Sequence, residues 1–147
     1  MQFTTAILST LLAGSAVASP LSTFAATEWT IESLKRTCAT DDSSCTWTFG
    51  ISTGAEGAAA TACTYEVKSS ATANATEASG GPVTCGAYTV TSGWSGQFGA
   101  GQGFTTLSVV DTDSKLIAYP AYTDTQLVNG TVVTPDLSFP VQTLPGQ

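Results

Sequence analysis

Histidine is absent from this sequence, and its absence removes several classes of enzyme at once. Serine and cysteine hydrolases use an imidazole as their general base, so both classes are disfavoured. Zinc sites that contain histidine are excluded, and no Cys-x-x-Cys pair is present as a substitute. A pair of carboxylates of the glycosidase kind is the remaining option, but none of the eleven acidic residues stands in a distinctive motif. We therefore expect no catalytic residues and a protein that is not an enzyme.

Basic residues are also scarce, with four Lys and Arg against eleven Asp and Glu and a net charge of −7. Nucleic acids and anionic membrane surfaces attract basic faces, so neither is expected as a partner. Charged residues make up only 10% of the chain, which is instead rich in Thr, Ser, Ala, Gly and Val. Such a composition favours short strands and turns over helices.

Long apolar runs are missing, and the nearest approach lies at the N-terminus. The apolar run around residues 6–14 is followed by Ala16-Val17-Ala18, the small-x-small pattern that signal peptidase requires. No Lys or Arg precedes the run, so the α-amino group supplies the only positive charge there. The run is shorter than the ~20 apolar residues that span a bilayer, so we expect no membrane insertion. We predict a signal peptide over residues 1–18 and one secreted, extracellular β domain over residues 19–147.

The four cysteines are Cys38, Cys45, Cys63 and Cys85, an even number that suits two disulfides in an oxidising compartment. Four cysteines allow three pairings. We favour Cys38–Cys45 with Cys63–Cys85, because each of these pairs flanks a polar, turn-rich segment that a hairpin would close.

Alternation of polar and apolar residues recurs at short spacing along the chain and predicts strands. Residues 29–38 could also be a helix, because their apolar spacing is ambiguous, but a strand is favoured. Asn129-Gly130 between two β-branched runs predicts a type I′ hairpin. Three prolines from residue 135 onward predict an extended tail or edge strand, and not a central strand. The expected strands cover residues 28–32, 46–51, 63–67, 83–92, 104–110 and 116–122.

These signals together define the predicted fold class. It is all-β: a single-domain antiparallel β-sandwich or bent β-barrel of about nine or ten short strands, braced by disulfides. Helices are too few for a parallel α/β fold.

A glycine-rich stretch covers residues 93–103 and lacks the Lys that a phosphate-binding loop places after its glycines. A flexible connection or bulged strand is therefore favoured over a phosphate site. Trp94 and Phe98 within it are the candidates for a ligand or partner surface. Trp29 and Trp47 lie on alternating strands and are expected in the core.

Three acidic residues, Asp111, Asp113 and Asp124, form the only constellation that suggests a cation. Two carboxylates one residue apart at a strand end can chelate calcium when neighbouring loops add further oxygens. The EF-hand pattern is absent, and a solvated turn is the favoured alternative. No other cofactor is expected.

Two N-glycosylation sequons are present, Asn74-Ala75-Thr76 and Asn129-Gly130-Thr131. Asn74 falls in a low-complexity segment expected to be an exposed loop, whereas Asn129 falls in a tight turn.

Several segments of the chain together resemble fungal small secreted proteins known as hypersensitive-response-inducing elicitors. The order of features is also similar, more distantly, to the Alternaria major-allergen family. The resemblance covers the chain from residue 28 to about residue 145 and contains no catalytic signature. It is carried by TEWTIESLKRTC, CTWTFGISTG, CTYEVK, GGPVTCGAYTVTSGWSGQF, GFTTLSVVD and IAYPAYTD.

The resemblance implies a compact β-barrel or sandwich that is secreted from a filamentous fungus. It implies perception by a plant host, through a surface receptor or an apoplastic protein, as a trigger of hypersensitive cell death and defence. Cys63 and Cys85 match the family's disulfide around a variable loop. Cys38 and Cys45 depart from the allergen's second pair, which lies nearer the C-terminus. Some relatives have an acidic, calcium-capable pocket, which bears on Asp111 and on its neighbour at position 113.

A second hypothesis comes from a different functional class. The chain is then a non-catalytic extracellular binding module for a cell-wall glycan or a small ligand, with or without calcium. That hypothesis requires an exposed aromatic patch around Trp94.

Overall fold

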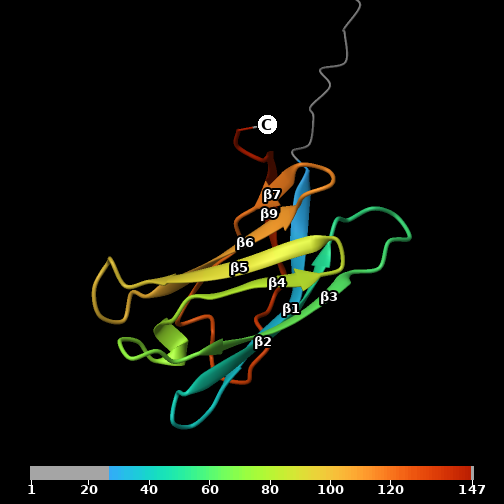
Figure 1. The fold of residues 1–147 in the computed structure, drawn as a ribbon. Helices are drawn as coiled ribbons and strands as arrows, with labels where there is room; N and C mark the ends of the chain where they lie inside the picture. The colour runs from blue at the N-terminus through green and yellow to red at the C-terminus, as the bar shows by residue number, and fades with distance from the viewer. Residues whose placement is uncertain (1–26, 147) are drawn as a thin grey trace, which may run out of the picture.

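The computed structural model describes residues 27–146, which form an all-β fold of nine strands and a single turn of 3-10 helix (Figure 1). The predicted fold class is thus confirmed, whereas the predicted signal peptide over residues 1–18 lies outside the described residues. No helix within residues 27–146 has the length and hydropathy of a membrane span. The elements are β1 (Glu28–Cys38), β2 (Ser44–Ser52), β3 (Thr61–Lys68), η1 (Ala75–Glu77), β4 (Gly80–Cys85), β5 (Tyr88–Ser95), β6 (Phe104–Asp111), β7 (Leu116–Ala118), β8 (Ala121–Thr123) and β9 (Leu137–Thr143).

Strand β1 explains why residues 29–38 are ambiguous as a sequence. Trp29 and Ile31 point into the core with a spacing of two, as do Leu34 and Arg36 further along. Between these pairs lies a β-bulge, where the register against β2 shifts and Ser33 adopts a positive φ of 50°. A bulge inserts one residue into a strand and reverses which face later residues occupy. The apolar spacing therefore changes phase within a continuous strand.

All strand pairs are antiparallel, and the sheet order is β3-β2-β1-β9-β7-β6-β5-β4, with β8 paired to β6 beyond the end of β7. The sheet bends until its two outer strands, β3 and β4, lie side by side, as Figure 1 shows. No backbone ladder joins β3 to β4 within the described part of the chain. The Cys63–Cys85 disulfide crosses this seam and closes the barrel covalently.

Glycines allow β4 to approach β3 closely on either side of that disulfide. A Cβ added to Gly80 would lie 2.5 Å from Cγ2 of Val67 and 3.2 Å from Cε2 of Tyr65, both on β3. Gly86 follows β4 with a φ of 58°, and a Cβ there would lie 2.8 Å from Cγ2 of Thr61. The seam is therefore packed too tightly to admit side chains at these two positions.

The proline-rich tail occupies a position that the sequence excluded. Strand β9 lies between β1 and β7, so the expectation that these residues could not form a central strand is wrong. The first half of β9, up to Pro140, pairs with β1, and the second half, from Val141, pairs with β7. The proline thus stands at the change of partner, where a missing N–H interrupts neither ladder.

The expected hairpin at Asn129-Gly130 is also wrong, although the turn itself is present. The N–H of Thr131 donates to the carbonyl of Val128 at 3.0 Å. Only Gly130 has a positive φ, at 70°, whereas a type I′ turn requires two such residues. The flanking residues pair with β1 and not with each other: the N–H groups at positions 130 and 133 donate to β1 carbonyls at 2.8 Å, and Val132 forms a bridge with Lys35.

Two further single strands expected from the sequence are each divided. The stretch 83–92 is broken by the turn at Gly86, which separates β4 from β5. The stretch 116–122 is broken at Tyr119-Pro120, which separates β7 from β8. Both expected core tryptophans, Trp29 and Trp47, are buried.

Removal of the seam disulfide tests its contribution to the fold. We predict that Cys63→Ser/Cys85→Ser lowers the free energy of unfolding by about 3 kcal/mol, because the cross-link restricts the unfolded chain over a long loop. The shorter Cys38–Cys45 loop predicts a smaller loss of about 2.5 kcal/mol on the same model. Urea unfolding of both double variants against the oxidised wild type measures the difference, and an unchanged midpoint for the first variant contradicts the prediction.

Overpacking tests the seam without touching a cysteine. We predict that Gly80→Ala lowers the free energy of unfolding by about 1–3 kcal/mol, because the new methyl group overlaps buried β3 side chains. Gly93→Ala in β5 is the matched control, since its Cβ would meet only Ser79 Oγ at 3.9 Å. Equal midpoints for the two variants in urea would show that the seam is not tightly packed.

Candidate functional site

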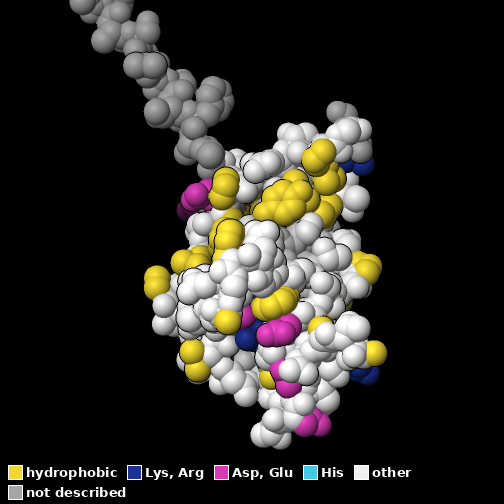
Figure 2. Space-filling model, turned by 90° about the vertical axis from the view of Figure 1, so that its left-hand side faces the viewer, with side chains coloured by type: hydrophobic (Ala, Val, Ile, Leu, Met, Phe, Trp, Pro, Cys, Tyr) yellow, Lys and Arg dark blue, Asp and Glu magenta, His cyan; other side chains and the backbone are white. Residues whose placement is uncertain are grey.

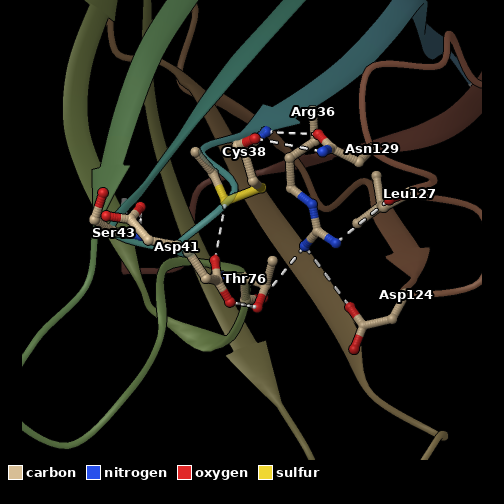
Figure 3. The surroundings of a disulfide bond; sticks show 10 residues. Arg36, Cys38, Asp41, Ser43, Thr76, Asp124, Leu127 and Asn129 are labelled. Atoms are coloured by element: carbon tan, nitrogen blue, oxygen red, sulfur yellow. Dashed lines mark hydrogen bonds and ion pairs between the residues drawn. A yellow bond between two sulfur atoms is a disulfide. The ribbon is translucent and has the colours of Figure 1, made fainter.

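The turn between β1 and β2 is fixed by the Cys38–Cys45 disulfide and by acidic side chains (Figure 3). Asp41 accepts a hydrogen bond from the N–H of Ser43 at 3.1 Å, and its hydrogen bonds with Ser43 lower the pKa of the Asp41 carboxyl. Asp42, at a φ of 54°, reaches across to η1 and accepts hydrogen bonds from both the N–H and the hydroxyl of Thr76. This end of the sheet is therefore joined to the loop that carries η1.

Beneath that turn lies Arg36, a charged side chain that is only 5% exposed. Its Nη1 donates to the carbonyl of Thr76 at 3.2 Å, and its Nη2 donates to the carbonyl of Leu127 at 3.4 Å. The guanidinium carbon lies 5.6 Å from the centroid of the Trp47 ring, within the range of a cation–π contact. As Figure 3 shows, Arg36 thus connects β1 to two segments that are distant in sequence.

The charge of Arg36 is balanced by Asp124 across a gap of 3.8 Å from Nη1 to Oδ1. Burial lowers the pKa of Arg36, and the negative charges of Asp124 and Asp42 act against that shift. Nε of Arg36 and Oδ1 of Asp124 are buried without a hydrogen-bond partner among the described residues. Loss of Asp124 would leave the Arg36 guanidinium as an uncompensated buried charge, which is strongly destabilising.

Trp94 belongs to the same network. Its Nε1 donates to Oδ2 of Asp124 at 3.0 Å, so the indole N–H is engaged within the protein. A Cβ added to Gly96 or to Gly103 would lie within 3 Å of the indole ring, so the backbone of the β5–β6 connection packs against it. Trp94 is consequently a half-buried support for that connection and not a free stacking platform.

Phe98, at the tip of the same connection, is the most exposed large hydrophobic side chain in the described residues, at 69%. Its ring stacks on Phe104 at the start of β6, with centroids 5.7 Å apart and an interplanar angle of 29°. In Figure 1 this connection projects from the barrel beyond β5 and β6. Of the two residues predicted for a ligand or partner surface, the structure exposes Phe98 and partly covers Trp94.

The molecular face that contains this connection carries few charges, as Figure 2 shows. Hydrophobic side chains lie scattered over it with a larger group in the upper half, and acidic side chains lie beside a basic one in the lower half. Most of the remaining surface in this view is uncharged and polar, which leaves exposed hydrophobic groups as its distinct features.

The three carboxylates predicted for calcium do not meet. Asp111 ends β6 and its Oδ1 accepts hydrogen bonds from the N–H groups of Asp113 and Ser114 at 3.0 and 3.1 Å, so this pair forms a turn. The hydrogen bonds with Ser114 lower the pKa of the Asp111 carboxyl. Asp124 lies beside the start of β6, roughly 20 Å away at about 3.3 Å per residue. Calcium at Asp111 and Asp113 stays a prediction, and Asp124 is no part of it.

Within the described residues, three potential metal ligands converge at one other place, formed by Cys38, Asp42 and Cys45. Both of these sulfurs are bonded to each other in the disulfide, so they are not available as thiolate ligands. The two sequon asparagines lie apart: Asn74 precedes η1 on the surface, and Asn129 lies in the turn beside β1.

Sequence reasoning missed Arg36, Asp42 and Tyr65. One signal for Arg36 was available. It lies two residues after Leu34 and two before Cys38, and inward and outward side chains alternate along this part of the strand, so all three share a face. The bulge at Ser33 hid this, because it shifts the phase that Trp29 establishes.

Tyr65 adds an unpaired hydroxyl to the interior near Arg36. It lies parallel to Trp47 and edge-on to Phe49, and neither its hydroxyl nor that of Ser92 has a hydrogen-bond partner in the described residues. Burial raises the pKa of Tyr65, and the Arg36 charge opposes this without cancelling it.

We predict that Tyr65→Phe leaves the free energy of unfolding at pH 7 unchanged or higher, because it removes a buried unsatisfied hydroxyl. Above about pH 10 the unfolded chain releases the Tyr65 proton while the native state retains it, so native stability falls as pH rises, by up to about 1.4 kcal/mol per pH unit. The variant should lose less stability in this alkaline range. Urea unfolding at neutral and alkaline pH, with exposed Tyr119→Phe as the control, measures this, and identical alkaline losses in all three proteins would contradict it.

Comparison with known proteins gives a family for this chain. The family model described as Effector TSP1 matches residues 30–144, which include all of β2 to β9 and β1 from its third residue. A protein named Effector TSP1 from Hypocrea virens is 54% identical to this chain, over 99% of this chain and the full length of that protein. The chain therefore belongs to the Effector TSP1 family of fungal effectors.

Proposed function

We propose that this protein is secreted and is perceived by a plant host, where it induces a hypersensitive response and defence. Its partner is a host surface receptor or an apoplastic protein that recognises the folded barrel. Support comes from the family, because a fungal effector acts on another organism, and from the whole-chain relation to a protein of that name.

The surface that we assign to recognition is the β5–β6 connection. Phe98 presents an aromatic ring to solvent and Phe104 supports it from below. Aromatic residues are enriched at protein interfaces because they bury a large area at a small cost in conformational entropy. The barrel beneath is braced by two disulfides, so the connection is presented on a rigid support.

We propose further that the protein acts through binding and not through catalysis. Buried Arg36 donates to two carbonyl groups, and its partly exposed partner Asp124 accepts a hydrogen bond from Trp94. These contacts join segments of the fold, which favours a structural role for Arg36, the one charged side chain that is buried among the described residues. The more distant relation to the Alternaria major-allergen family remains part of this proposal and concerns the barrel alone.

A second candidate function is a binding module for a cell-wall glycan or a small ligand. The same exposed aromatic pair favours it, since a flat ring at the surface can stack on the apolar face of a sugar. This candidate differs from the first in its ligand, and a polysaccharide pull-down with wild type and Phe98→Ser distinguishes the two.

Leaf infiltration tests the leading proposal. We expect the purified, oxidised protein to cause local cell death or an oxidative burst. We expect Phe98→Ser to raise the dose required for this response at least tenfold, because one aromatic anchor at an interface contributes about 2 kcal/mol or more. Val128→Ser is the matched control, since Val128 is another hydrophobic side chain that is 57% exposed but lies in the turn beside β1.

Reduced and alkylated protein serves as the control for folding and should be inactive. A response that survives reduction would show that a linear segment is perceived and not the folded surface. No response to the oxidised wild type in several hosts would overturn plant perception and would leave the glycan-binding module as the candidate to test.

A further inference from the structure

The two sequons differ in what their asparagine amides do. Asn74 stands exposed before η1, and its side chain makes no capping hydrogen bond. The amide of Asn129 is engaged on both atoms: the N–H of Cys38 donates to Oδ1 at 2.7 Å, and Nδ2 donates to the carbonyl of Cys38 at 3.3 Å (Figure 3). One side chain thus satisfies both backbone polar groups of one strand residue.

On the side away from β2, the Cys38 backbone has no other hydrogen-bond partner among the described residues. The N–H of Ala39 donates to the carbonyl of Ser44 at 2.8 Å, so Cys38 and Cys45 face each other as a non-hydrogen-bonded pair of the antiparallel ladder. In such a pair the N–H and C=O of Cys38 point away from β2. They point toward Asn129, which occupies the place that a neighbouring strand would take.

This contact and a glycan on Asn129 exclude each other on geometric grounds. Because Oδ1 and Nδ2 meet the same residue, the hydrogen that bonds to the Cys38 carbonyl is the one on the Oδ1 side of Nδ2. A glycosylated amide is planar and trans, as a peptide bond is, so the sugar carbon occupies that same side. The sugar would stand where the carbonyl of Cys38 now lies.

We propose that Asn74 carries the glycan of this protein and that Asn129, despite its sequon, stays unmodified in the folded secreted molecule. The glycan donor is a lipid diphosphate-linked oligosaccharide. A bond forms between the sugar's anomeric carbon and Nδ2 of Asn74, the bond from that carbon to the diphosphate breaks, the lipid diphosphate leaves, and Nδ2 loses one proton. This inference rests on the secretion proposed above.

Glycopeptide mapping tests the proposal on the full chain, expressed in a filamentous fungus and purified from the medium. Enzymatic deglycosylation in heavy-oxygen water converts each modified asparagine to labelled aspartate, and a parallel incubation in the same water without the enzyme gives the label that spontaneous deamidation adds at Asn129-Gly130. We expect label at Asn74 and none at Asn129. Label at Asn129, or its absence from Asn74, would overturn the assignment, whereas recovery from the medium reports on secretion separately.

Three variants separate the sequon from the amide contact. Thr131→Ala removes the second sequon and keeps the amide, so the glycan mass and the denaturant midpoint should not change. Asn129→Ala should lower the midpoint with no loss of glycan mass, because the Cys38 backbone loses both partners. Asn74→Gln should lose all glycan mass and keep the midpoint. A loss of glycan in Thr131→Ala, or an unchanged midpoint in Asn129→Ala, would contradict the proposal.

Discussion

The contact between β3 and β4 decides the shape of this molecule. A sheet of this size could remain open with two exposed edges, and open edges invite pairing with other chains. Here the edges face each other at a distance set by Gly80, which lets β4 pack against Val67 and Tyr65. The Cys63–Cys85 bond then holds the seam where no ladder of hydrogen bonds does. Core packing of the inward side chains follows from this closure, because a single bent sheet has an interior only once its ends meet.

A second constraint arises where β9 leaves β1. Beyond Ile31 the second half of β1 has no neighbouring strand on that side, and residues 127–133 take its place. Side chains, in addition to backbone hydrogen bonds, hold this segment against β1. Arg36 reaches the carbonyl of Leu127, and Asn129 completes the backbone of Cys38. These polar side chains thus attach residues 127–133 to β1 where no strand pairs with it, which gives a physical reason for a charged residue at an inward position.

The sequence predicted most strands because alternation along a strand is a local property, and β2 and β3 show it without interruption. It also favoured the observed disulfides from the turn-rich segments between the cysteines. It failed where a distant partner decides the outcome. The turn at Asn129-Gly130 was recognised, but its flanks pair with β1, which no local pattern records. The tail after residue 135 became an inner strand because Pro140 falls between two partners. Of the candidate site, the glycine-rich surroundings indicated Phe98, whose exposure the structure shows, whereas Arg36 and Asp124 meet only in the fold.

The residues that stabilise this fold are different from those that the β5–β6 connection exposes to solvent. In the β5–β6 connection, Gly99 and Gly101 have positive φ values and an added Cβ would meet nothing within 4 Å, so this loop is not held by core packing. Its supports are Trp94, next to the last residue of β5, and Phe104, the first residue of β6. Burial of the Phe98 ring, by contrast, would gain free energy only against a partner, since it is left in solvent here. A substitution at the tip can therefore leave the seam, the disulfides and buried Arg36 intact, and this independence is what the proposed recognition through the β5–β6 connection requires.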